Sequence, residues 1–195
     1  MLIEDESYAG EDWYAEEMVD RVYLRCRFSD VDLTEASTQG VRFEECEFFN
    51  VRLNASRHTD SAFLRCQFNR TNLFEAEFTG CKLTGSAFRD SQLRPLTVVG
   101  GDWSFVGLSG ADLHGVVFRG VRMREADLTG ANLNDAVVSG VDLSGATLTR
   151  VKLARADLRG SDLSALDPLT AELNGAIIDA DQAITIALVL GLTVR

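Results

Sequence analysis

Four cysteines are the residues of this sequence best suited to chemistry. Cys26, Cys46 and Cys66 follow one another at intervals of 20 residues, and Cys81 comes 15 residues later. Such a series could hold a metal ion or form a disulfide. Zinc sites, however, use short spacings such as C-x₂₋₄-C. If cysteines 20 residues apart stack on successive coils, about 4.8 Å separates them. This spacing exceeds the roughly 3.8 Å between the Cβ atoms of a disulfide. We therefore favour free thiols buried as small apolar side chains.

Histidines and aspartates are the other candidates for chemistry. His58 and His114 occupy unrelated positions, so they form neither a catalytic triad nor a metal pair. The segment GGDWSFVG at 100–107 lacks the lysine and the following helix of a phosphate-binding loop. Repeated Asp-Leu pairs could supply carboxylates for acid–base catalysis. Their regular spacing, however, places these carboxylates on an outer surface without a pocket, so we expect them to be solvated. The sequence thus predicts no enzyme, no metal site and no cofactor.

A five-residue repeat must position all of these side chains. Between Phe28 and Ile178, the third residue of each block is Leu or Phe at 23 of 31 positions. In the whole chain, 13 of the 16 glycines stand at the fifth position of this register. A period of five matches neither the 3.6 residues of a helical turn nor the alternation of a strand. It fits short straight segments whose first and third residues point inward and whose fifth residue takes a corner.

Residues 20 apart form uniform columns, which indicates four blocks in each coil. Leucine occupies all eight positions of the column from Leu33 to Leu173, and a second column changes from phenylalanine to leucine between Phe88 and Leu108. The pattern of small residue, Asp or Asn, Leu or Phe, and two further residues resembles that of pentapeptide-repeat proteins. The expected fold class is therefore an all-β solenoid, a right-handed quadrilateral β-helix with a short C-terminal helix as its cap.

Three regions follow from this register. We expect an acidic, disordered tail at 1–10, the β-helix at 11–180, and a C-terminal capping and dimerisation segment at 181–195. Asp179 or Asp181 would cap a helix that ends at Gly191. That helix is apolar nearly all round, so it must be covered.

The C-terminal helix could be a lid on the last coil alone, or a lid and a symmetric dimer contact together. We favour the second interpretation. The predicted homodimer interface comprises Ile184, Ile186, Leu188, Val189, Leu190 and Leu192.

Two segments depart from the repeat. The stretch RDSQLRPLTVVGGDWSFVGL at 89–108 puts Pro95 at a corner, Leu96 where a small residue is expected, and Trp103 inward. We expect a repacked coil there. Pro168 stands at an inward place near the C-terminal end and should interrupt the ladder.

Charge is concentrated at the two ends of the chain. Of the net charge of −11, residues 1–20 contribute eight acids and no base, and residues 156–195 contribute six acids and two bases. This sign excludes binding to nucleic acid phosphates through bulk charge. No apolar run is long enough to cross a bilayer and the acidic N-terminus does not fit a signal peptide, so we expect a cytoplasmic protein without membrane contact.

The segments SQLRPLT at 91–97 and DADQAITIALVLGL at 179–192 narrow the resemblance. They resemble the MfpA and Qnr group of fluoroquinolone-resistance proteins, with the mycobacterial MfpA type as the nearer. The resemblance implies rod-shaped dimers, joined at their C-terminal ends, that mimic DNA, bind and inhibit DNA gyrase, and protect it from fluoroquinolones. The unbroken register leaves no room for the long loops that many Qnr proteins carry.

The mimicry must rest on rod shape and a local acidic patch, because the total charge falls well short of that of duplex DNA, which carries about one charge per 1.7 Å. The predicted partner contacts are outward acids at the second position of their blocks: Asp142, Asp157, Asp162, Asp167 and Glu172 near the dimer seam, with Asp102, Asp112 and Asp127 further out. The alternative is a generic solenoid scaffold for another protein.

Overall fold

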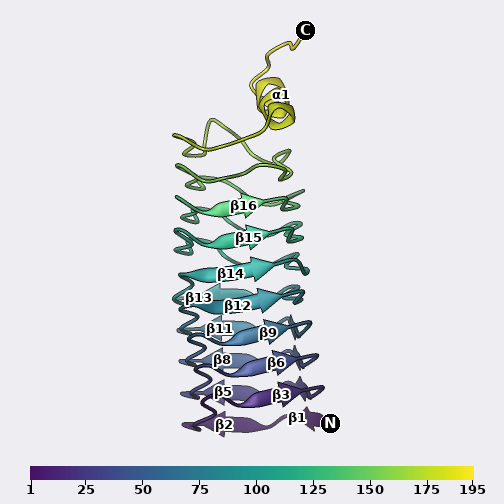
Figure 1. The fold of residues 1–195 in the computed structure, drawn as a ribbon, viewed down its shortest axis with the longest axis vertical. Coiled ribbons are helices and arrows are strands. Elements are labelled where there is room, and N and C mark those ends of the chain that lie inside the picture. Colours follow the sequence, from purple (N-terminus) through teal and green to yellow (C-terminus); the bar gives the residue numbers. More distant parts are fainter.

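Stacked rectangular coils form one straight rod in the computed structural model, which describes residues 1–195. The N-terminus lies at one end, and the helix α1 lies at the other (Figure 1). Residues 20 positions apart pair in parallel along most of the rod, as Ile3 does with Tyr23 and Phe28 with Phe48. The predicted right-handed quadrilateral β-helix is confirmed.

Each coil has four sides, which we number in chain order from residues 1–5, 6–10, 11–15 and 16–20. The first side contains β1 (Leu2–Glu4), β4 (Val22–Leu24), β7 (Arg42–Glu44) and β10 (Ala62–Leu64). The second contains β2 (Ser7–Ala9), β5 (Arg27–Ser29), β8 (Glu47–Phe49), β11 (Gln67–Asn69) and β13 (Ala87–Arg89). The fourth contains β3 (Glu17–Val19), β6 (Ser37–Gln39), β9 (Arg57–Thr59), β12 (Ala76–Thr79), β14 (Leu96–Val99), β15 (Val117–Arg119) and β16 (Val137–Ser139).

The third side is held by single bridges instead of strands. These run from Asp12 through Asp32 and Arg52 to Gln92, and they resume at Asp112. Tight turns replace the straight segments there, and similar bridges extend the first and second sides beyond their last strands. The third side is thus the most turn-rich wall of the rod.

The corner at the fifth position of nearly every block has a left-handed backbone. The φ angle is +56° at Asp30, +53° at Ala55 and +67° at Gly110. Glycine adopts this conformation without a Cβ clash, and Asp and Asn tolerate it better than other residues. This requirement explains why glycine gathers at the fifth position in the sequence.

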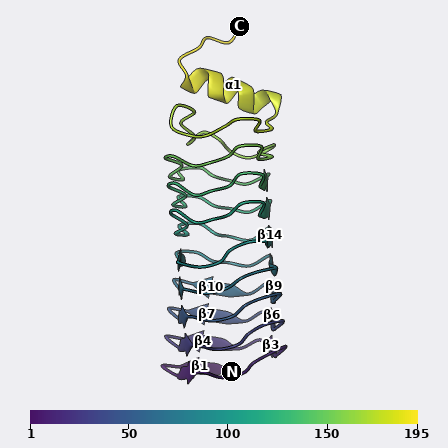
Figure 2. The ribbon, with the colours of Figure 1, turned by 90° about the vertical axis from the view of Figure 1, so that its left-hand side faces the viewer.

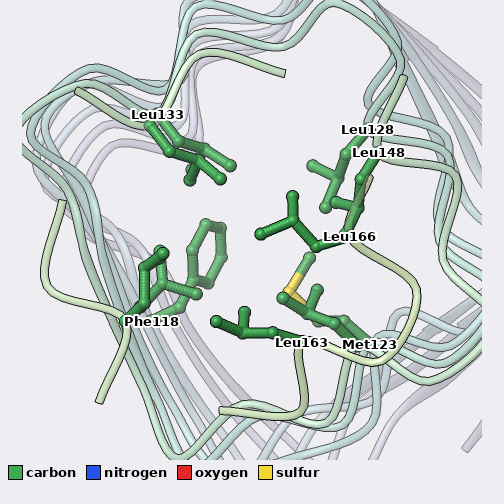
Figure 3. Close-up of a pocket in the computed structure, with 11 residues that line it drawn as sticks. Phe118, Met123, Leu128, Leu133, Leu148, Leu163 and Leu166 are labelled. Atoms are coloured by element: carbon green, nitrogen blue, oxygen red, sulfur yellow. The ribbon is translucent and has the colours of Figure 1, made fainter. Parts of the chain in front are cut away.

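Columns of inward side chains fill the axis. Phe28, Phe48 and Phe68 stack with ring centroids 4.9 and 4.7 Å apart, which matches the spacing of the coils. Phe118 is the last aromatic ring of the core, and beyond it leucines predominate. Side chains from all four sides converge around Phe118, Met123 and Leu166 (Figure 3). The gap among them is only about 10 Å³, so this part of the core is closely packed.

The irregular coil at 89–108 is accommodated in the rod. Leu96 is buried although it stands at a small-residue position, and Trp103 is fully buried, as the sequence predicted. Gly101 is required beside them, because a Cβ there would lie 2.0 Å from the backbone oxygen of Cys81.

The predicted C-terminal helix is α1 (Ala180–Val189), which lies across the last coil (Figure 2). Asp179, one of the two proposed caps, begins it in a capping box: its carboxylate accepts from the Gln182 amide at 3.0 Å, and the Gln182 side chain accepts from the Asp179 amide at 2.9 Å. Buried Gln182 then donates to the backbone oxygen of Leu158 at 2.6 Å. The structure has no helix that is both long and apolar enough to cross a membrane.

The prediction that residues 1–10 are disordered is wrong. They form β1 and β2, which pair with β4 and β5, so the β-helix begins near Leu2 instead of residue 11. The Tyr8 ring stacks on Phe28 at 5.1 Å, and Arg25 donates two hydrogen bonds to the Asp5 carboxylate, at 2.8 and 2.9 Å. An ordered first coil also places its acids on a rigid surface.

Deleting residues 1–10 tests this correction. The deletion should lower the free energy of unfolding by about 2–4 kcal/mol, because it uncovers the rings of Tyr23 and Phe28, and burial of one such side chain contributes about 1.5–3 kcal/mol. Urea unfolding followed by circular dichroism measures the change. A truncated chain as stable as the full chain would mean that these residues form a tail after all.

Candidate protein-interaction surfaces

The outer face of α1 is an exposed apolar surface at the C-terminal end of the rod. Of the predicted dimer residues, Ile184, Leu188, Val189, Leu190 and Leu192 are exposed. Ile186 differs, because it is half-buried and packs against the core of the last coils. Exposed Leu169, on the last coil, adds to the apolar surface at this end of the rod. The helix therefore acts as a lid through Ile186 and Gln182 and leaves a second apolar face uncovered.

The predicted acidic patch is divided among the four sides of the rod. The 20-residue register places Asp102, Asp142 and Asp162 on the first side, Asp127 and Asp167 on the second, Asp112 and Glu172 on the third, and Asp157 on the fourth. The structure thus aligns small groups of these acids along the rod but does not bring all eight onto one face.

Arginines neutralise half of the predicted acids. The ion pairs are Arg122–Asp102 at 3.1 Å, Arg94–Asp112 at 2.6 Å, Arg124–Asp142 at 2.6 Å and Arg159–Asp157 at 2.7 Å. Hydrogen bonds from Ser144 and Arg124 lower the pKa of Asp142. These four carboxylates are satisfied within the chain, so they are poor candidates for partner contact.

The remaining four acids make no ion pair. Asp127, Asp162 and Asp167 each accept a hydrogen bond from the amide two residues on, which fixes the carboxylate at the start of a tight turn. Glu172 is bridged through its backbone to Lys152 on the third side. Asp162, Asp167 and Glu172 stand on three successive sides of the last coil, where they surround the C-terminal end of the rod.

A hollow between the last coil and α1 adds two acids that the sequence had marked only as helix caps. Asp162, Asp179 and Asp181 line this hollow together, and none of its lining residues is basic. Hydrogen bonds from the amides of Gln182 and Gly160 lower the pKa of Asp179, so this carboxylate stays charged. The position of Asp179 and Asp181 beside the apolar helix was the feature of the sequence that could have identified them as part of this acidic surface. We call Asp162, Asp167, Glu172, Asp179 and Asp181 the C-terminal acidic ring.

The cysteines and histidines, which were the candidates for chemistry, form no reactive site in the structure. All four cysteines are free and buried, as predicted, and burial raises the pKa of Cys81 to about 11. His58 lies in the core, where Thr38 contacts its Nδ1 at 2.8 Å and Ser56 its Nε2 at 3.0 Å. His114 is exposed. No group of three or more His, Cys, Asp or Glu side chains is placed to hold a metal ion.

The family model for pentapeptide repeats matches residues 26–57, 59–93, 108–135 and 126–164. The chain belongs to the pentapeptide-repeat family. The matches leave out 94–107, which is most of the irregular coil at 89–108, although this coil stays within the rod (Figure 1). No curated protein matches the chain in sequence.

Solved structures extend the likeness over the whole rod. A trypsin-treated variant of QnrB1, a plasmid-mediated fluoroquinolone resistance protein, is 20% identical with a TM-score of 0.83, over 100% of this chain and 98% of that chain. Full-length QnrB1 has a TM-score of 0.64 at 20% identity, over 98% and 100%. HetL, involved in heterocyst differentiation regulation in Nostoc sp. strain PCC 7120, has a TM-score of 0.57 at 18% identity, over 91% and 86%. At these identities the likeness shows the fold.

Acid should weaken the fold through His58. Burial lowers the pKa of His58 from 6.5 to about 3, so the neutral ring stabilises the fold fully above pH 6.5. That contribution is lost as the pH falls from 6.5 toward 3, because the unfolded chain binds the proton first. Between pH 7 and pH 5 the loss should be about 2 kcal/mol.

Urea titrations at the two pH values measure this loss. The wild-type protein and His114→Gln should lose about 2 kcal/mol more than His58→Leu. Equal losses in all three proteins would show that His58 is not the group responsible.

Proposed function

We propose that this chain is a DNA-mimicking protein that binds DNA gyrase, inhibits it and protects it from fluoroquinolones. The observation that carries the proposal is the correspondence of the whole rod with QnrB1, a plasmid-mediated fluoroquinolone resistance protein. The segments at 91–97 and 179–192, which resemble those of the MfpA and Qnr group, support the same assignment. Gyrase acts on the chromosome, so the proposed site of action is the cytoplasm.

The C-terminal acidic ring is the proposed gyrase contact. A surface that binds DNA is basic, and its partner must present unpaired negative charge at fixed positions. Asp162, Asp167 and Glu172 meet this condition, because they make no ion pair and stand on a rigid coil. The paired acids Asp102, Asp112, Asp142 and Asp157 are no longer part of the proposed contact.

The proposed functional unit is a homodimer joined through the outer face of α1. Ile184, Leu188 and Leu192 would be covered by the same residues of a second copy, as a two-fold interface requires. Such a dimer brings two C-terminal acidic rings to the centre of a rod of double length. That arrangement supplies the local concentration of charge that one chain lacks.

Another protein partner is the competing interpretation. HetL shares the fold and is involved in heterocyst differentiation regulation, so the fold alone does not identify gyrase as the partner. Purified gyrase distinguishes the two interpretations, because a scaffold for another protein would leave supercoiling unchanged.

The dimer is tested by Leu188→Asp. Leu188 is 57% exposed, so the substitution should leave the fold intact while placing an unpaired carboxylate in the apolar contact. Light scattering should give the mass of one 21.4 kDa chain for this variant and of two chains for the wild-type protein. Val19→Asp, at a residue 55% exposed near the opposite end, is the matched control and should remain dimeric. A dimeric Leu188→Asp variant would move the interface away from α1.

The gyrase contact is tested by neutralising the ring with Asp162→Asn, Asp167→Asn and Glu172→Gln. Asparagine keeps the turn-forming oxygen, so the rod should fold normally. Inhibition of supercoiling should weaken about tenfold or more, because each lost ion pair contributes about 0.2–1 kcal/mol, and inhibition should become less sensitive to salt.

The matched control removes three charges from the other end of the rod, with Glu6→Gln, Asp12→Asn and Glu17→Gln. These acids are exposed and make no ion pair, and Asp12 starts the same kind of turn. The control should inhibit gyrase like the wild-type protein. If both triple variants lose inhibition equally, overall charge is responsible and the ring is not the contact.

A further inference from the structure

A break in the third side of the rod is the feature that the proposed function leaves unexplained. The bridges of this side stop at Gln92 and resume at Asp112, although the first, second and fourth sides stay connected across the same two coils. The break adjoins residues 94–107 of the irregular coil, which the family model for pentapeptide repeats does not match. The two lips of the break are residues 90–95 and 109–115.

Backbone groups on both lips lack the partners that the ladder gives them elsewhere. In the regular register, the amides of Asp90 and Leu93 would donate to Ser109 and Asp112, and the amide of Asp112 would donate to Ser91; none of these bonds forms. Pro95 adds to the break, because it has no N–H to donate to the next coil. The exposed lips therefore offer a row of free donors and acceptors, as a strand edge does.

Two adjoining hollows of about 700 and 500 Å³ lie along this row and share Asp90, Ser91, Leu93 and Asp112. The larger hollow is also lined by Phe74, which is 38% exposed, and by His114. Arg94 joins the lips through its ion pair with Asp112. The surface therefore combines free backbone groups with an apolar ring and room for side chains.

We propose that this hollow binds an extended segment of a partner polypeptide. A strand laid along the lips would take the free amides and carbonyls by main-chain hydrogen bonds, as in β-strand addition. In the larger hollow, Asp90 is the carboxylate without an ion partner, since Asp112 is paired with Arg94; Arg89 lines only the smaller hollow. The segment should therefore carry a basic side chain facing Asp90 and an apolar one facing Phe74. This inference does not rest on gyrase being the partner.

Peptide binding tests the proposal directly. The probe is a fluorescein-labelled, six-residue peptide of alternating lysine and valine, titrated against the full chain by fluorescence polarisation up to about 1 mM. A matched peptide with N-methyl groups on one edge keeps the charge but cannot donate from that edge, and it should bind at least about tenfold more weakly. In the ¹⁵N-labelled protein, the amides of Asp90, Leu93 and Asp112 should shift on binding.

The protein variants separate a specific contact from general charge attraction. Asp90→Asn should weaken binding up to about fivefold. Asp30→Asn should not, although Asp30 has the same corner position and left-handed backbone, because its amide is paired with Phe49 in the closed ladder. Absence of binding, equal binding of the methylated peptide, equal effects of the two substitutions, or amide shifts elsewhere on the rod would each overturn the proposal.

Discussion

The parallel backbone ladder between residues 20 apart is the interaction on which the rest of the structure depends. Most amides of a coil donate to a carbonyl of the coil above or below, as Leu33 does to Arg52 at 2.7 Å and Asp32 to Glu11 at 2.9 Å. This register turns each position into a column. Rings then stack inside the rod, and ion pairs such as Arg155–Asp135 link successive coils outside it. One coil cannot bury its own interior, so stability comes from stacking.

The regular part of the fold was predictable because the sequence repeats with a fixed period. The columns of Leu33 and Phe28, the burial of the cysteines and the cap at Asp179 or Asp181 all follow from residue type and spacing. Residues 1–10 do not read as part of the solenoid because their acidity is typical of disorder, although Ile3 and Tyr8 keep the inward register and pack on the core. Here backbone pairing outweighs composition.

The acidic residues show that counting charges along the sequence does not predict which carboxylates are paired. Charge along the chain identified the acidic C-terminal end, but not the arginines that reach Asp112 from 18 residues before or Asp142 from the same distance. Side-chain pairing depends on position in three dimensions, so the C-terminal acidic ring emerged only from the folded rod. The break beside Pro95 is similar: the sequence indicated an irregular coil, whereas the unpaired lips depend on which ladder bonds fail to form.

Competition between this protein and duplex DNA for purified gyrase tests the central claim most directly. A mimic of DNA must occupy a surface that DNA also uses, so binding of the two is mutually exclusive. Gyrase binding by the wild-type protein, measured at increasing concentrations of linear duplex, should fall to zero as the duplex saturates the enzyme. A stable ternary complex with unchanged affinity for this protein would contradict DNA mimicry.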